Sequence, residues 1–175
     1  MASGATLFFL TPLAYTPAAA NFATLDTISD GSTPAATIPV LDFDGAADEF
    51  ADWIVVVPNH YSDTTGFTFQ YTYAMSGSDT DLVDLEFSVA LLGDTEIATA
   101  DQGLDTATPV SIQDTPVVSV TANKIAVSPA GALAKGDFAG TVAAGSTIII
   151  RCQRDEGAAE NTDDLQLISV HVTET

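Results

Sequence analysis

The amino-acid sequence predicts an all-β fold, an antiparallel two-sheet β-sandwich of the jelly-roll type with an extended N-terminal arm. From residue 38 onward, short segments carry apolar residues at every second position, the pattern of strands with one buried face. Gly, Pro and Asp are frequent between these segments, and none has the apolar spacing of an amphipathic helix. The chain therefore divides into an arm, residues 1–37, and a β-sandwich domain, residues 38–175.

The arm stands out by its lack of charge. Residues 1–25 contain no charged side chain, although the chain has 24 acidic and 4 basic residues and a formal net charge of -20. We do not expect a signal peptide, because a basic n-region is missing and Pro12 and Pro17 interrupt the apolar stretch. The arm is too apolar to lie free in water, so it needs a surface, either its own domain or a neighbouring subunit, and we favour contact with another subunit. Its predicted contact residues are Leu7, Phe8, Phe9, Leu10, Leu13, Tyr15 and Phe22.

The clearest predicted strands are 66–75 and 82–92. In the first, aromatic residues from Phe67 to Tyr73 alternate with polar or small ones, and the second repeats the alternation with Phe87 and four aliphatic residues. The sequence SGSDTD between them has the composition of a turn, which predicts a hairpin. The remaining predicted strands are 38–43, 53–57, 109–113, 117–122, 124–128, 147–153 and 165–173.

The number of strands and the long connections fit an eight-stranded jelly roll. An immunoglobulin-type sandwich is the alternative, although it needs no arm and many of its members carry a pair of cysteines. Cys152 is the single cysteine, so no disulfide forms within the chain, and its apolar strand predicts burial. The Ala-rich segment 130–144 is predicted to hold no more than a short helical turn, because of its glycines.

The charge balance excludes several classes of partner. Nucleic acids and anionic membranes are bound through Lys and Arg, of which there are only four. No stretch approaches the roughly 18 apolar residues of a membrane-spanning helix. We interpret the acidic excess as a solvated surface rather than as adaptation to high salt.

Two acidic clusters are candidate calcium sites, because Ca²⁺ prefers oxygen ligands. Neither has the complete pattern of an EF-hand loop, so we interpret both as solvated loop acids and predict no metal and no cofactor. The first cluster contains Asp42, Asp44, Asp48 and Glu49, and the second contains Asp155, Glu156, Glu160, Asp163 and Asp164.

We predict that the chain is not an enzyme. His60 lies in a turn-like sequence and His171 at an outward strand position, and GxSxG, P-loop and GxGxxG motifs are absent. Trp53 and the aromatic residues of 67–73 are predicted to be core residues rather than a sugar-stacking platform. A hydrolase that acts on a cell-surface polymer is a third hypothesis, which requires a cleft that holds two carboxylates at a suitable distance.

Several segments resemble small β-sandwich virion proteins of tailed bacteriophages, especially head-decoration (cement) proteins. The resemblance covers most of the chain and implies jelly-roll subunits, often trimeric, on a capsid lattice, without catalytic residues. It rests on LFFLTPLAYTP, NFATLDT (21–27), PVLDFD (39–44), the aromatic strand 67–73, IIIRCQRDEG and LQLISVHVTE.

The resemblance and the arm together favour a structural virion protein on the outer surface of a phage capsid. Its expected partners are the major capsid protein, contacted by the arm residues, and two further copies in a homotrimer. We expect the trimer axis near the arm and the charge-poor segment 128–150. The alternative is a tail-fibre or receptor-binding module that recognises a glycan through loops 93–108 and 154–164.

Overall fold

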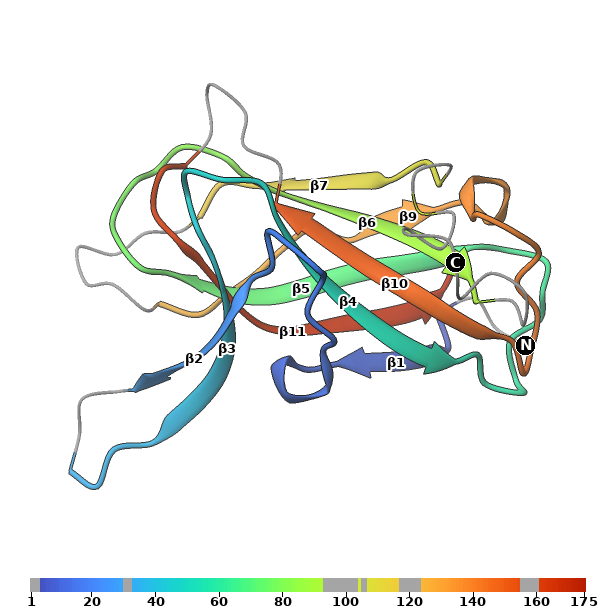
Figure 1. Cartoon of the computed structure of the whole chain (residues 1–175), viewed down its shortest axis with the longest axis horizontal. Coiled ribbons are helices and arrows are strands. Elements are labelled where there is room, and N and C mark those ends of the chain that lie inside the picture. Colours follow the sequence, from blue (N-terminus) through green and yellow to red (C-terminus); the bar gives the residue numbers. More distant parts are fainter. Residues whose placement is uncertain (1–3, 30–32, 93–103, 105–106, 117–123, 155–160) are drawn as a thin grey trace.

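The computed structural model of the chain describes residues 4–29, 33–92, 104, 107–116, 124–154 and 161–175. These residues form two antiparallel sheets packed face to face, with two 3-10 turns, η1 (Pro12–Ala14) and η2 (Lys135–Asp137) (Figure 1). No helix in the described part of the chain is long and apolar enough to cross a membrane.

The first sheet contains seven strands. Its order is β2 (Thr24–Ser29), β3 (Thr37–Phe43), β11 (Leu165–Glu174), β5 (Phe67–Met75) and β8 (Ala126–Val127), with β1 (Thr6–Leu10) paired to β11 and β9 (Gly131–Leu133) paired to β5. The second sheet has the order β4 (Glu49–Val56), β10 (Thr147–Arg154), β6 (Val83–Leu91) and β7 (Val110–Asp114).

This strand order confirms the predicted jelly roll. We count β8 and β9 as one interrupted strand and leave the N-terminal strands β1 and β2 aside. The body strands then run first–last–third–sixth in one sheet (β3, β11, β5, β8/β9) and second–seventh–fourth–fifth in the other (β4, β10, β6, β7). Successive strands thus cross repeatedly between the sheets, as in a jelly roll, and the order differs from that of an immunoglobulin domain.

The predicted hairpin between 66–75 and 82–92 is wrong. Both segments are strands, but β5 pairs with β11, β8 and β9, whereas β6 pairs with β10 and β7. The two strands face each other across the core, where the rings of Phe69 and Phe87 stack with centroids 4.8 Å apart. The alternation correctly identified the buried faces, but it contains no information on which sheet each strand joins.

Most other predicted strands are present with shifted ends. The segments 38–43, 109–113, 147–153 and 165–173 correspond to β3, β7, β10 and β11, and 124–128 is reduced to the short β8. Strand β4 begins four residues before the predicted 53–57, and the segment 117–122 lies outside the described residues. The predicted short helical turn within 130–144 is η2, next to the unpredicted β9.

The structure corrects the boundary between arm and domain. Strand β1 pairs with β11 of the same chain, and β2 forms a hairpin with β3, so the predicted boundary at residue 37 falls inside this hairpin. Leu7 and Leu10 are buried in the core of their own chain. Part of the predicted arm is therefore an edge of the sandwich, because burying these leucines removes apolar surface from water.

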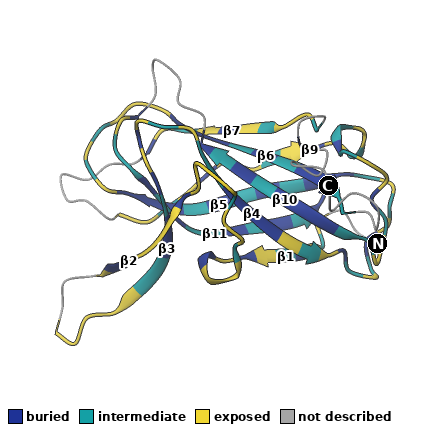
Figure 2. Cartoon of the chain, viewed as in Figure 1, coloured by how far each residue is buried: buried dark blue, intermediate teal, exposed yellow. Residues whose placement is uncertain are grey.

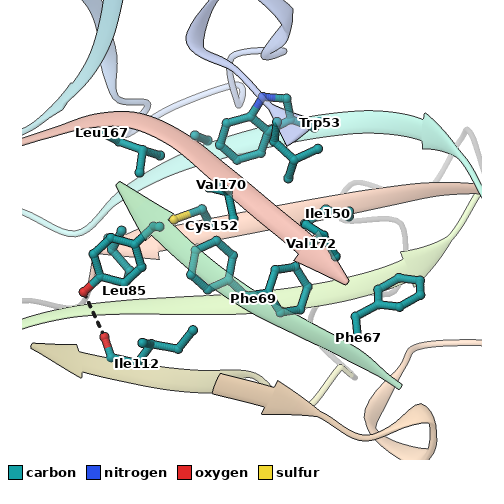
Figure 3. Close-up of a cluster of buried hydrophobic side chains, with 14 of the residues drawn as sticks. Trp53, Phe67, Phe69, Leu85, Ile112, Ile150, Cys152, Leu167, Val170 and Val172 are labelled. Atoms are coloured by element: carbon teal, nitrogen blue, oxygen red, sulfur yellow. Dashed lines mark hydrogen bonds between the residues drawn. The ribbon is translucent and has the colours of Figure 1, made fainter. Parts of the chain in front are cut away.

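The core lies between the sheets and is centred on the aromatic residues of β5. Phe67, Phe69, Tyr71 and Tyr73 are completely buried, and Trp53 is 1% exposed, as predicted (Figures 2 and 3). The Tyr71 hydroxyl donates to the Ile112 carbonyl on β7 at 3.1 Å. These side chains fix the distance between the two sheets, and Cys152 is buried among them.

Two neighbouring leucines test whether β1 belongs to the core. Leu10 is 2% exposed and Leu13 is 72% exposed. We expect Leu10→Ala to lower the free energy of unfolding by about 2–5 kcal/mol, because it leaves a cavity. Leu13→Ala, the matched control, should change it by less than about 0.5 kcal/mol. Urea denaturation followed by Trp53 fluorescence measures both, and equal, small losses would contradict the placement of β1.

Candidate functional site

The predicted contact residues do not form one surface. Leu7 and Leu10 face the core, and Phe8 packs partly buried against it, with its ring 6.1 Å from that of Phe67. The Tyr15 hydroxyl donates to the Ala23 carbonyl at 3.2 Å, which holds it to its own segment. For these four residues the predicted intersubunit contact is replaced wholly or partly by contacts within the chain. The predicted residues that stay exposed are Phe9 (67%), Leu13 (72%) and Phe22 (44%).

The uncharged segment 11–23 closes one side of the sandwich. Thr16 and Asp52 exchange two backbone hydrogen bonds (2.7 and 3.3 Å), and the Phe50 amide donates to the Asn21 carbonyl at 2.7 Å. The Trp53 indole N–H donates to the Thr11 carbonyl at 3.0 Å. The segment thus covers the outer edge of β4, an edge that would otherwise be open to pairing with other chains.

The two histidines contact the same residue of β1. Nε2 of His171 lies 2.9 Å from Thr6 Oγ1, and Nε2 of His60 lies 3.0 Å from the Thr6 carbonyl oxygen. The exposed Phe9 ring stacks on the His171 imidazole, with centroids 4.6 Å apart and planes 8° apart. The described contacts of His60 and His171 attach β1 to the rest of the sandwich, and His171 orients the Phe9 ring.

The structure brings the two predicted acidic clusters together. Asp42 on β3, Asp44 after it and Glu49 at the start of β4 meet Asp164, which precedes β11. With Thr24 of β2 they line a pocket of about 200 Å³, called the acidic pocket below. Asp48 is exposed and does not line it. Three members of the second cluster, Asp155, Glu156 and Glu160, lie outside the described residues.

Backbone amides hold part of the acidic pocket in place. The Asp44 amide donates to Glu49 Oε2 at 2.8 Å, and the Gly45 amide donates to Asp164 Oδ1 at 3.2 Å. Burial raises the pKa of Asp42 to about 6, with a further contribution from repulsion by Asp164 and the other nearby carboxylates. Burial also raises the pKa of Glu49.

Within the described residues, the acidic pocket shows neither a metal centre nor an aromatic surface for a sugar. Within the described ranges, no group of three His, Cys, Asp or Glu side chains is arranged to hold a metal ion. The pocket holds the carboxylates that hydrolysis requires, but its volume is below the roughly 300–1,000 Å³ of typical ligand pockets. None of its lining residues is aromatic, so it offers no ring for a sugar to stack on.

Arg154 anchors the acidic end of the molecule, a role that the sequence did not reveal. The sequence places Arg154 in the loop 154–164, whereas in the structure it is the last residue of β10 and only 2% exposed. Its guanidinium donates to the carbonyls of Phe43 (3.0 Å), Asp163 (2.9 Å) and Asn161. One cation thereby ties the end of β3 to the segment before β11.

Asp163 and Asp79 extend this anchoring. The Asp79 amide donates to Asp163 Oδ2 at 2.7 Å, and the Thr162 amide donates to Asp79 Oδ2 at 3.1 Å. Backbone donors of this kind lower the pKa of Asp79, the Asp81 amide making the largest contribution. Asp163 is thus part of a structural network rather than a free ligand.

The comparisons with known proteins do not identify a function. No family model and no curated protein matches the chain. Sixty chains of solved structures match it, among them an arabinose-bound GH51 α-L-arabinofuranosidase at 11% identity and a TM-score of 0.47. That alignment covers 98% of this chain but only 27% of the arabinofuranosidase.

We expect Arg154→Lys to lower the free energy of unfolding by about 2–4 kcal/mol. A lysine ammonium does not reproduce the planar fork of donors, so buried carbonyls lose their partners. The comparison variant is Arg151→Lys on the same strand, which loses the two-pronged pair with Asp52 but keeps a positive charge beside that carboxylate, so the loss should be smaller, about 1 kcal/mol. Chemical denaturation measures both variants, and a smaller effect at residue 154 than at residue 151 would refute the anchoring role.

Proposed function

We propose that this chain is a structural virion protein that decorates and stabilises a phage capsid by binding the lattice of the major capsid protein. The observation that carries the proposal is the distribution of charge. In a chain of net charge -20, residues 1–25 are uncharged, and their described part projects Phe9, Leu13 and Phe22 into solvent. The resemblance of the sequence to head-decoration proteins supports the same function.

The physical basis of this binding is burial of the exposed apolar side chains of residues 1–25, called the N-terminal segment. Transfer of apolar surface out of water contributes about 25 cal/mol per Å² before ordering costs are subtracted. Phe9 is held against His171 and Leu13 is the middle residue of the turn η1, so little conformational freedom remains to be lost. We place the protein on the outer surface of the capsid, where its acidic body faces solvent.

We also propose that the subunits form a homotrimer. With so many acidic residues, two copies meet favourably only through charge-poor surface, because carboxylates that face each other across an interface are costly. The segment 128–150 has only Lys135 and Asp137 as charged residues, and Lys135 forms an ion pair with Asp63. This segment and the N-terminal segment are therefore the surfaces nearest the proposed axis.

Substitution of exposed apolar residues tests the contact with the capsid. We expect the double variant Phe9→Thr, Leu13→Thr to remain folded and to bind undecorated particles at least about tenfold more weakly, because it removes two apolar anchors. The matched control is Ile125→Thr, Val127→Thr, which alters residues of similar exposure (49% and 57%) next to and within β8. Co-sedimentation with undecorated particles gives the affinities, and equal binding by both variants would refute the proposed surface.

The number of copies per particle tests the decoration of the capsid lattice, and the mass of the purified protein tests the homotrimer. We expect a number of copies set by the capsid lattice, whereas a tail-fibre or receptor-binding module is present in few copies. Light scattering of the purified chain should give about 54 kDa, three times the 18.1 kDa of one chain. A monomer in solution together with well-separated subunits on the particle would contradict the trimer.

A further inference from the structure

Two buried side-chain oxygens without partners belong to facing residues of β3 and β11. Asp42 and Gln166 are opposite each other in the antiparallel register of these strands. Asp42 Oδ1 and Gln166 Oε1 are both buried and accept no hydrogen bond from the described residues. A buried polar atom without a partner destabilises the folded state, because it has lost its hydrogen bonds to water. Two acceptors do not satisfy each other, but one proton on the carboxyl turns it into a donor for the amide oxygen.

Asp42 and Gln166 lie where the β2–β3 hairpin joins the rest of the sheet, so a change in their interaction affects the whole hairpin. The β2–β3 hairpin extends beyond the body of the sandwich (Figure 1). In the described part of the first sheet, only the last three residues of β3, Leu41–Phe43, pair with β11, and β2 pairs with β3 alone. Asp42 is the middle residue of this short ladder, which we call the hairpin root.

The groups that face Asp42 are almost all negative. They come from each neighbouring element: Asp26 on β2, Asp44 after β3, Glu49 at the start of β4 and Asp164 before β11. Arg154 acts on one of these groups, Glu49, whose pKa it lowers, and its guanidinium donates to backbone carbonyls. An ionised Asp42 therefore meets repulsion from several sides, whereas a protonated Asp42 avoids it.

We propose that Asp42 and Gln166 form a proton-operated clasp at the hairpin root, in which the protonated Asp42 carboxyl donates a hydrogen bond to Gln166 Oε1 and loss of the proton loosens the hairpin. The clasp is closed in mildly acidic solution and open in neutral solution. It acts on the orientation of the hairpin, and it is independent of what the chain binds.

The direction of the pH dependence follows from linkage. The pKa of Asp42 is about 6 in the folded protein and 3.8 in its ordinary state, so between these values the folded protein binds more protons than the unfolded one. Stability of the hairpin root consequently falls as the pH rises from about 4 to about 6, and it levels off above that range.

The test combines a titration with hydrogen exchange on the full chain. Carbon NMR of the Asp42 carboxyl should show a midpoint near pH 6. Gln166→Met removes the acceptor and should lower this midpoint by about half a unit or more. Protection of the amides in the β3–β11 ladder, corrected for intrinsic exchange rates, should fall about tenfold between pH 5 and pH 8.

Two variants complete the test. Asp42→Asn supplies a permanent donor, so its protection should be as high at pH 8 as at pH 5. Asp137→Asn, which removes one charge from the distant turn η2, should behave as the unmodified chain does. An Asp42 midpoint near pH 4 would overturn the proposal, since the Gln166 amide group then donates to an ionised carboxylate. A midpoint near pH 6 that Gln166→Met leaves unchanged would overturn it too, because burial and repulsion then act without the hydrogen bond.

Discussion

The scarcity of cations is the constraint on which the loops of this structure depend. Four basic residues face 24 acidic ones, so carboxylates have to be held mainly by hydrogen-bond donors rather than by ion pairs. Glu174 is an example: it is buried and accepts from the Ser62 amide at 2.9 Å and from the Ser62 hydroxyl, and these bonds lower its pKa. Backbone N–H groups aimed at a carboxylate stabilise its charged form without a counter-ion. This solution fixes the loops locally but leaves the net charge of the chain unchanged.

The same constraint explains how the described cations are used. Arg151 forms a two-pronged pair with Asp52 and lies 5.0 Å from the centre of the Phe50 ring, which secures the edge strand β4. Arg154 donates to backbone carbonyl groups and also lowers the pKa of Glu49 in the acidic pocket. A buried guanidinium that satisfies several carbonyls joins chain segments far apart in sequence. Arg154 therefore joins the segments at this end of the molecule, and it offsets the charge of the acidic pocket only in part, because four carboxylates line that pocket.

Alternation in the sequence predicted the buried faces of the strands but little about their partners. The aromatic residues of β5 and the apolar positions of β6 are those that the structure buries, because period two is a direct consequence of strand geometry. Sheet membership depends on contacts distant in sequence, so the false hairpin between β5 and β6 followed. Strand β1 was missed because its buried residues, Leu7 and Leu10, are three apart and a register shift lies within the strand. The acidic pocket unites Asp42 with Asp164, more than a hundred residues away, and no local pattern predicts such an encounter.

The loops around the acidic pocket and the loops 57–66 and 134–146 lie at opposite ends of the jelly roll. The connections at 44–48, 76–82 and 161–164 meet at one end, where Gly45 contacts Thr162 and Asp79 binds the 161–163 segment (Figure 1). The loops at 57–66 and 134–146 lie toward the opposite end, where Asp63 is paired with Lys135 and Glu174 is held by Ser62. Among the described residues, the carboxylates of the acidic pocket are gathered at one end, so copies that approach with these ends facing each other repel one another. Electrostatics therefore favours contacts between copies that leave the acidic pocket and the β2–β3 hairpin facing solvent.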